Sequence, residues 1–473
     1  MSALTDIPLL RTELKYTWRI AWPLFVAQLA QMGTGVVDTI MAGHYNAGDL
    51  AAIAIGYNAW LPLLLFIVGV MVASAAIVAQ DFGAGRIEKI RSLLPQSLWV
   101  AALLGLLSTP LAFFNEPVLG LLDLAADTET KASAYLRMVA LGLPAAAVFQ
   151  ALRFHTQGVG ITMPFAWSSA IGFVANIPLN YAFIYGEWGA PELGAEGCGI
   201  ATALSMWLTL VLIVGYMLMS TRVAPYIPPL RWAPPDRAAL GEILGLGIPI
   251  GLTLFLEVGV FSIIGLLVAT LGDTVMASHQ IAFNIWDVFY IPMLSIASAM
   301  STRIGHAIGA GDKVGVNRAL LVGSLVSLII ALGALLILVL VPEAIISIYT
   351  DSESIRTVAV RLIRLAAFFI VIDAVQIIMS FVLRAYKDTR FPFWAMLVSY
   401  WFIALPVGYW LGLVSATTPA DGAAGFWYAS ILGITACAVL LLWRVWRLLH
   451  RPLPNPDTFE PEVMPGITEE MSH

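Results

Sequence analysis

Residues 54–80, with the sequence AIGYNAWLPLLLFIVGVMVASAAIVAQ, contain no Asp, Glu, Lys or Arg. A helix of about 20 mostly apolar residues is long enough to cross the hydrocarbon core of a bilayer. Charge-free segments of similar length also occur at 92–115 and 154–186. Only 11% of the 473 residues are charged, whereas a soluble protein has about 25%. The sequence therefore predicts a polytopic membrane protein.

Twelve membrane-spanning helices are expected, because apolar segments of this length recur along the whole chain. These segments exceed the roughly 9–11 residues of a membrane β-strand, so a barrel is not expected. The expected spans are 16–40, 51–80, 93–114, 133–156, 163–186, 195–220, 243–270, 276–306, 319–342, 356–385, 392–414 and 423–448. Most of the 24 Lys and Arg residues fall in loops on one side of the membrane. This side should be the cytoplasmic one, and both termini should lie on it.

The sequence repeats itself at a constant offset, the one that separates Pro23 from Pro249. The same offset relates Asn58 to Asn284, Trp60 to Trp286, and Gly83 to Gly309. Each repeat contains six expected helices, so both repeats begin on the same side of the membrane. They should be related by a pseudo-two-fold axis along the membrane normal, as in transporters that work by alternating access.

The predicted fold is therefore an all-α membrane protein with two six-helix lobes. The N-lobe is expected at 1–220, a cytoplasmic inter-lobe linker at 221–242, the C-lobe at 243–450 and a polar C-terminal tail at 451–473. The protein is expected to be a monomer.

Four acids lie well inside the expected helices: Asp38, Glu257, Asp287 and Asp373. Each costs about 2.5–3.5 kcal/mol at the centre of a membrane helix, so such residues usually face the protein interior or water. No Lys or Arg is expected at the same depth. A proton or a mobile cation must then neutralise the acids, which is the chemistry of cation-coupled transport of cationic cargo.

Amide side chains accompany these acids on the same helix faces. Gln31 shares a face with Asp38, and Gln376 shares a face with Asp373. Asn176 and Asn180 are one turn apart in another span. Asp287, Gln31, Asn284 and Gln376 are secondary candidates for the transport path.

Motifs for an enzyme or an ATPase are absent from the sequence. It contains no Walker GxxxxGK[ST], HExxH or GxSxG pattern, and its two cysteines, Cys198 and Cys437, have no metal-ligand spacing. We therefore expect no catalytic residues, no cofactor other than a coupling ion, and no nucleic-acid partner. Membrane lipid and small molecules are the expected partners.

Three acid-bearing segments together resemble the multidrug and toxic compound extrusion (MATE) family, specifically its bacterial NorM branch. They are PLFVAQLAQMGTGVVDTIMAG at 23–43, GIPIGLTLFLEVGVFSIIG at 247–265 and FFIVIDAVQIIMSFVLRAYKDTRFPF at 368–393. The resemblance covers roughly residues 10–450. It implies an antiporter of the bacterial inner membrane that exports cationic amphiphilic molecules, such as dyes and fluoroquinolone-like drugs, against inward sodium or protons, and so contributes to antibiotic resistance.

The resemblance also implies roles for individual residues. Asp38, Asn176 and Asn180 match an N-lobe site for protons and drug. Glu257, Asp373 and Tyr290 match a C-lobe cation site, where Glu257 and Asp373 could hold Na⁺. Some relatives have a tyrosine where this chain has Phe369. The loss of that oxygen weakens the expectation of sodium coupling.

Two other transport functions stay open on sequence grounds. A flippase for lipid-linked oligosaccharides would need Lys or Arg deep in its cavity to bind the pyrophosphate, where this chain has acids. A 12-helix uptake transporter for a metabolite is compatible with the acids, although the family resemblance weighs against it.

Overall fold

The computed structural model describes residues 7–120, 124–228 and 233–453. Parts of the predicted linker at 221–242 and of the predicted tail at 451–473 therefore lie outside the described residues. Within those residues every regular element is a helix. The predicted all-α fold is confirmed.

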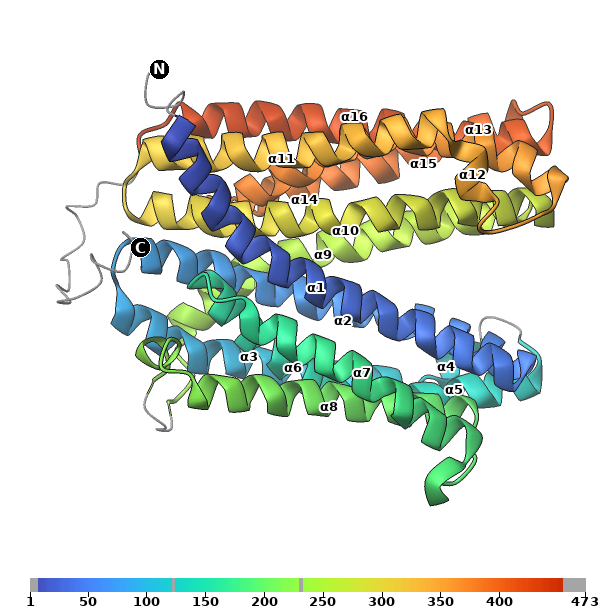
Figure 1. The fold of residues 1–473 in the computed structure, drawn as a ribbon, viewed down its shortest axis with the longest axis horizontal. Coiled ribbons are helices and arrows are strands. Elements are labelled where there is room, and N and C mark those ends of the chain that lie inside the picture. Colours follow the sequence, from blue (N-terminus) through green and yellow to red (C-terminus); the bar gives the residue numbers. More distant parts are fainter. Residues whose placement is uncertain (1–6, 121–123, 229–232, 454–473) are drawn as a thin grey trace.

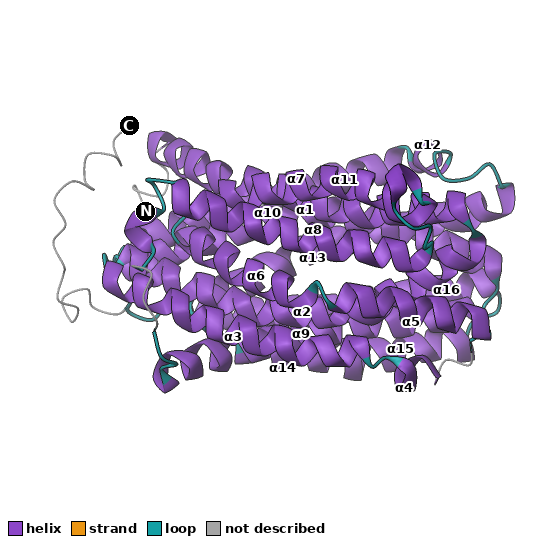
Figure 2. Cartoon of the chain, turned by 90° about the horizontal axis from the view of Figure 1, so that it is seen from below, coloured by secondary structure: helices purple, strands orange, loops and turns teal. Residues whose placement is uncertain are grey.

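The helices form two lobes that follow one another along the chain (Figure 1), with loops at the helix ends (Figure 2). The first lobe contains α1 (Ile7–Tyr45), α2 (Ala47–Gly83), α3 (Ile87–Phe113), α4 (Glu116–Leu119), α5 (Ala126–Ala140), α6 (Leu143–Gly158), α7 (Met163–Tyr185), η3 (Glu187–Gly189) and α8 (Ala195–Met219). After η4 (Ala224–Tyr226), the second lobe contains α9 (Arg237–Ala269), α10 (Asp273–Gly309), α11 (Lys313–Leu340), α12 (Pro342–Ile346), α13 (Glu353–Ala385), α14 (Arg390–Met396), η5 (Leu397–Ala404), α15 (Leu405–Tyr409), η6 (Trp410–Val414) and α16 (Pro419–Leu449).

Ten helices in the described part of the chain are long and apolar enough to cross a membrane, and the bent pair α5–α6 makes eleven. The predicted span 133–156 is this pair, which bends by 44° where Gly142 separates the two helices. The predicted span 163–186 is α7, which has 23 residues but carries the polar pair Asn176 and Asn180. It packs between α1 and α8. Segment 390–414 is a single span interrupted by the π-helical turns η5 and η6.

The repeat in the sequence is also a repeat in the structure. Helices α2 and α10 begin and end at positions separated by the repeat offset, and α3 and α11 begin at positions with the same separation. The turns after α2 and α10 contain Gly85 and Gly311, with φ of 70° and 68°. Glycine adopts this left-handed conformation without strain, which allows the chain to reverse directly into the next helix.

The lobes touch where α2 and α10 end. A Cβ atom on Gly83 would collide with the carbonyl oxygen of His306, and a Cβ atom on Gly309 would collide with the carbonyl oxygen of Gln80. Gln80 and His306 themselves occupy equivalent positions in the two repeats. The same contact is therefore made twice, once from each lobe.

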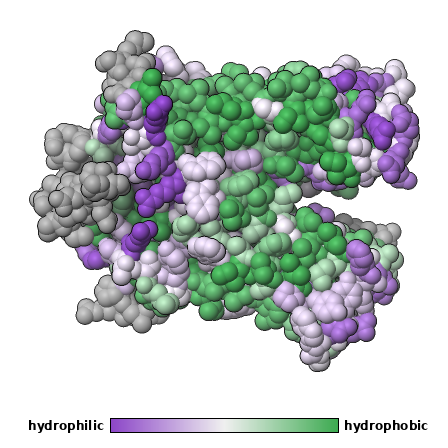
Figure 3. Space-filling model, in the orientation of Figure 1, coloured by the Kyte–Doolittle hydropathy of each residue, from purple (hydrophilic) through white to green (hydrophobic). Residues whose placement is uncertain are grey.

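Polar contacts close this end of the molecule. The carboxylate of Glu13 on α1 accepts hydrogen bonds from Nε and Nη2 of Arg303 on α10 at 2.8 and 2.9 Å. Further along the same helices, Gln28 Nε2 donates to Ser295 Oγ at 2.7 Å. At the opposite end the lobes separate and leave a notch (Figure 3). The cleft between the lobes is therefore closed at the end where α1 begins and α16 ends, and it is open at the opposite end.

The sides of the molecule are apolar. Figure 3 shows a broad hydrophobic surface between two polar ends. Leu106, Leu266 and Ile329 are among the large apolar side chains that are exposed. A surface of this kind is stable only against lipid, and it fits the multi-pass arrangement.

Candidate functional site

The N-lobe contains a buried carboxylate surrounded by neutral hydrogen-bond donors. Asp38 on α1 is only 5% exposed and points toward α7 and α8. Its Oδ1 accepts a hydrogen bond from Asn180 Nδ2 at 2.5 Å, and its Oδ2 accepts one from Thr202 Oγ1 at 3.2 Å. The second N–H of Asn180 donates to Asn176 Oδ1 at 2.9 Å. Asp38 forms no ion pair with a described Lys or Arg.

This cluster has unused hydrogen-bonding capacity. Asn176 Nδ2 and Asn180 Oδ1 are buried without a partner among the described residues. The thiol of Cys198 also interacts electrostatically with Asp38. An amide can present either its N–H₂ or its oxygen to a neighbour. The site can therefore donate to an ionised Asp38, and after an amide flip it can accept from a protonated one.

The C-lobe contains two acids that interact electrostatically with each other. Asp373 on α13 is 2% exposed, and its Oδ2 accepts a hydrogen bond from Trp286 Nε1 at 2.9 Å. Glu257 on α9 is half-buried. Tyr290 on α10 interacts electrostatically with both acids, and its ring packs on Trp286 at a centroid distance of 5.1 Å. Trp286 thus contacts both Asp373 and Tyr290, a partner that the sequence did not reveal, and Glu257 interacts with these two residues only electrostatically.

The C-lobe acids also have a basic neighbour. Arg384 comes from the last turn of α13 but is only 9% exposed, with its guanidinium 4.2 Å from the centroid of the Phe381 ring. It interacts electrostatically with Glu257 and Tyr290. The sequence predicts no Lys or Arg at the depth of the acids, and Arg384 does belong to a helix end, but a long side chain carries its charge far from its position in the helix.

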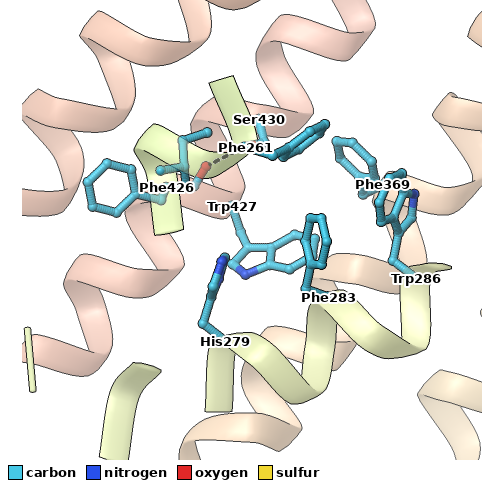
Figure 4. Close-up of a pocket in the computed structure, with 9 residues that line it drawn as sticks. Phe261, His279, Phe283, Trp286, Phe369, Phe426, Trp427 and Ser430 are labelled. Atoms are coloured by element: carbon cyan, nitrogen blue, oxygen red, sulfur yellow. Dashed lines mark hydrogen bonds between the residues drawn. The ribbon is translucent and has the colours of Figure 1, made fainter. Parts of the chain in front are cut away.

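A small aromatic pocket lies between α9, α10, α13 and α16 (Figure 4), and one of its lining residues, Trp286, donates the hydrogen bond to Asp373. Its walls include Phe369 and Trp286, and it has room for about one water molecule. His279 Nδ1 and Trp427 Nε1, both on its lining, are buried without a described partner. Phe369, where the family resemblance implies a tyrosine in some members, is thus part of a pocket with unused polar atoms.

The secondary candidates fall in two places. Gln376 is buried one turn after Asp373, with its amide near the Cys437 thiol. Gln31 on α1 and Asn284 on α10 are exposed, and Asp287 is half-buried on the same face of α10 as Asn284. Among the described residues no three His, Cys, Asp or Glu side chains are grouped as metal ligands. A site for a coupling cation would therefore depend on two carboxylates and neutral oxygens.

Known proteins match this chain along nearly its whole length. The profile of the MatE family matches residues 23–182 and again residues 249–410. Multidrug resistance protein NorM of Vibrio cholerae is 39% identical over 431 residues, which are 91% of this chain and 94% of that protein. Multidrug resistance protein PmpM of Pseudomonas aeruginosa is 37% identical over 457 residues, with 96% and 95% covered.

A solved structure shares the fold. The eukaryotic MATE transporter AtDTX14 has a TM-score of 0.83 and 20% sequence identity, with 95% of this chain and 97% of that chain covered. The two family matches begin at positions 23 and 249, which are the repeat-related prolines Pro23 and Pro249. Because both halves match one family and the relatives match end to end, the chain belongs to the multidrug and toxic compound extrusion (MATE) family.

Proposed function

We propose that this protein is a cation-coupled antiporter that exports cationic amphiphilic drugs and dyes across the bacterial inner membrane, with both termini in the cytoplasm. The names of its relatives, multidrug resistance proteins, support drug export. The observation that carries the proposal is Asp38, a carboxylate enclosed in a membrane lobe with amide and hydroxyl partners but no described basic partner. Such a group can change its charge during transport.

Asp38 acts in this proposal as the proton-binding residue. In the ionised state it is held by Asn180 and Thr202. In the neutral state its own O–H donates to Asn180 Oδ1 after the amide rotates, so either state keeps a partner. A proton taken up from outside favours one arrangement of the N-lobe, and its release to the cytoplasm restores the charge that attracts a cation.

The C-lobe acids form a second cation site in this proposal. Glu257 and Asp373 bind Na⁺ or a proton beside Tyr290. The positive charge of Arg384 neutralises part of their negative charge and so reduces their attraction for the ion. The cleft open at one end and closed at the other corresponds to one of the two states of alternating access. With the termini in the cytoplasm, this state faces outward.

The rival transport functions fit the site less well. A pyrophosphate-linked lipid would require basic side chains along the cleft. In the middle of α10 the charged side chain is instead an acid, the half-buried Asp287. Uptake of a metabolite is distinguished by direction, since an importer would move its substrate with the ion and not against it.

Transport by reconstituted protein tests the proposal. Proteoliposomes with an acidic lumen, and separately with a sodium-rich lumen, should take up ethidium from outside, because the ion leaves as the dye enters. ATP without a gradient should give no uptake. Asp38→Asn keeps the size and hydrogen bonding of the side chain but fixes it in the neutral state. It should fold, bind detergent and lipid normally, and lose uptake driven by the pH gradient.

The control is Asp273→Asn, which removes an exposed acid at the outer end of α10. It should transport like the wild type. Wild-type uptake by Asp38→Asn in sodium-free buffer would show that the proton uses another residue. Failure of the wild-type protein to take up any cation under either gradient would overturn the proposed function itself.

A further inference from the structure

A cavity of about 350 Å³ lies between α9 and the turn 386–389, which joins α13 to α14. Helices α9 and α14 pack together along one edge of the molecule (Figure 2). The turn belongs to the closed end, because the carbonyl oxygen of Ala385 just before it accepts a hydrogen bond from Gln80 of the N-lobe at 2.7 Å. Gly241 and Gly245 of α9 leave the space open, since nothing lies within 4 Å of the Cβ position of either. The cavity has room for a phosphate group with an organic substituent.

The lining of this cavity carries one positive charge that has no described counter-charge. Lys387 Nζ donates to Glu242 Oε1 at 2.7 Å, and Asp388 Oδ2 accepts a hydrogen bond from Arg444 Nε at 2.6 Å. Arg390 also lines the cavity, but it is exposed and forms no ion pair with a described residue. The charges around the cavity are therefore balanced except for one guanidinium, which an anion would complete.

The charges are not needed to build the turn. The turn 159–162 joins α6 to α7 in the N-lobe and has the same length as the turn 386–389. In each of them a backbone N–H donates to a carbonyl oxygen five residues earlier, at 2.9 Å. The N-lobe turn has no charged residue and places Gly160 at φ of 87°, whereas the C-lobe turn places Lys387 at φ of 59°. Lysine is strained in this left-handed conformation and glycine is not, so the C-lobe turn keeps its charge against the preference of the backbone.

The cavity leads to side chains that face lipid. Gly245, Ile248 and Leu252 follow one another on α9 at spacings of three and four residues and therefore share a face. Ile248 and Leu252 are exposed. On α14, the exposed Trp394 lies one turn after Arg390. Apolar side chains of this kind contact acyl chains, and tryptophan is typical of the headgroup layer. The cavity is thus placed where a lipid headgroup meets the hydrocarbon core.

We propose that this cavity binds the headgroup of an anionic phospholipid from the cytoplasmic leaflet. The guanidinium of Arg390 pairs with the phosphodiester. The hydroxyl of Thr389, which lines the cavity and has no described hydrogen-bond partner, can rotate to donate to the same group. The acyl chains lie along Ile248 and Leu252. Because one positive charge is uncompensated, the site prefers a lipid with one net negative charge, such as phosphatidylglycerol, to a zwitterionic one.

The lipid site has a role separate from the paths of cargo and coupling ion. From the function proposed above it takes only the orientation that places the closed end in the cytoplasm. A headgroup in the cavity joins α9 to the turn 386–389, which the ion pair between Glu242 and Lys387 already connects. Bound lipid should therefore stabilise the closed end and raise the midpoint of thermal unfolding.

Native mass spectrometry of the purified full-length protein in detergent tests the site, because it resolves single bound lipids. The probe is dioleoylphosphatidylglycerol, and dioleoylphosphatidylcholine has the same phosphodiester without a net charge. The first phosphatidylglycerol should bind several-fold more tightly than phosphatidylcholine. Arg390→Gln should raise the Kd for phosphatidylglycerol about tenfold, as expected for loss of a charge-assisted contact. Arg390→Lys should lose less, because the ammonium keeps the charge but not the planar fork. Gly245→Leu should also weaken binding, since it fills the cavity and changes no charge.

The matched control is Arg19→Gln, which removes an exposed arginine from the same end of the molecule and should bind phosphatidylglycerol like the wild type. Lipid-free Arg390→Gln should unfold at the wild-type temperature, and phosphatidylglycerol should raise that temperature less than it does for the wild type. Wild-type affinity in Arg390→Gln and Gly245→Leu would overturn the proposal, as would an equal loss in Arg19→Gln, which would show diffuse attraction. Displacement of the lipid by excess inorganic phosphate would show that phosphate alone is the ligand. No transport is measured, so failure of the antiporter proposal would leave this result unaffected.

Discussion

At the scale of single residues, the two lobes use different chemistry around their acids. Asp38 has an amide, a hydroxyl and a thiol as neighbours, all of them neutral. Asp373 has an indole N–H, and Glu257 has Arg384 within electrostatic range. A fixed positive charge competes with any mobile cation for the same carboxylates. The C-lobe site should therefore bind its ion less tightly than two unpaired acids would.

Arg384→Gln tests this competition. Removal of the guanidinium should lower the Na⁺ concentration that gives half-maximal ethidium uptake by a few-fold, because Glu257 then meets less positive charge. The measurement is uptake at a series of sodium gradients and constant pH. Arg364→Gln is the control, since Arg364 on the same helix is exposed and shows no described contact with the acids. An unchanged half-maximal concentration in Arg384→Gln would show that the arginine has only a packing role.

The sequence identified the site residues where polarity alone marks them. Asp38, Asn176 and Asn180 stand out because nothing else in their spans is as polar, and the structure brings them into contact. Thr202 and Trp286 carried no such signal, because threonine and tryptophan are common in membrane helices. Their role depends on which helices pack together, and helical periodicity within one segment does not contain that information.

At the scale of elements, the positions of the membrane spans could be predicted from the sequence, whereas bends and π-helical turns within them could not be predicted as well. Hydrophobicity locates α2 and α10 because lipid requires an apolar helix surface. The bend between α5 and α6 is local, and only Gly142 followed by Pro144 signals it. The π-helical turns η5 and η6 have no comparable signal in the sequence.

The contact between α2 and α10 makes a prediction for these helices. Gly83→Ala should destabilise the protein, because the new methyl group meets the backbone of His306 and can be accommodated only if the lobes move apart. Thermal unfolding in detergent should show a lower midpoint. Gly215→Ala on α8 is the control, since nothing lies within 4 Å of its Cβ position. Replacement of glycine by alanine there should stabilise the helix by about 0.5–1 kcal/mol. A Gly83→Ala variant as stable as Gly215→Ala would refute the close contact.

At the scale of the whole molecule, the repeat and the two-lobe fold followed from the constant offset between matching Gly, Pro, Asn and Trp positions. The state of the cleft did not, because both states of an alternating-access protein share one sequence. The ion pair between Glu13 and Arg303 is part of what selects the state described here, since it joins the lobes at the closed end. Breaking it should shift the population toward the opposite state.

Glu13→Gln tests this shift. Spin labels on the exposed residues Lys89 and Lys313, one in each lobe near the closed end, report their separation. The variant should show an added population at longer distance, because one of two charged partners is lost. Glu88→Gln, which removes an exposed ion pair with Arg91 inside one lobe, should leave the distances unchanged. Identical distance distributions in Glu13→Gln and the wild type would show that the ion pair does not hold the lobes together.

The paired glycine contact also bears on the origin of the chain. Gly83 packs on the backbone of His306, and Gly309 packs in the same way on the backbone of Gln80. Each lobe therefore contacts the other through the same surface. Reciprocity of this kind is what a two-fold axis imposes on two identical subunits. A half-length ancestor could have met a second copy of itself through this surface before duplication and fusion joined the two genes. The repeat offset would then equal the length of that ancestor plus the segment that now joins the two repeats. The glycines would be the remnant of a homodimer interface.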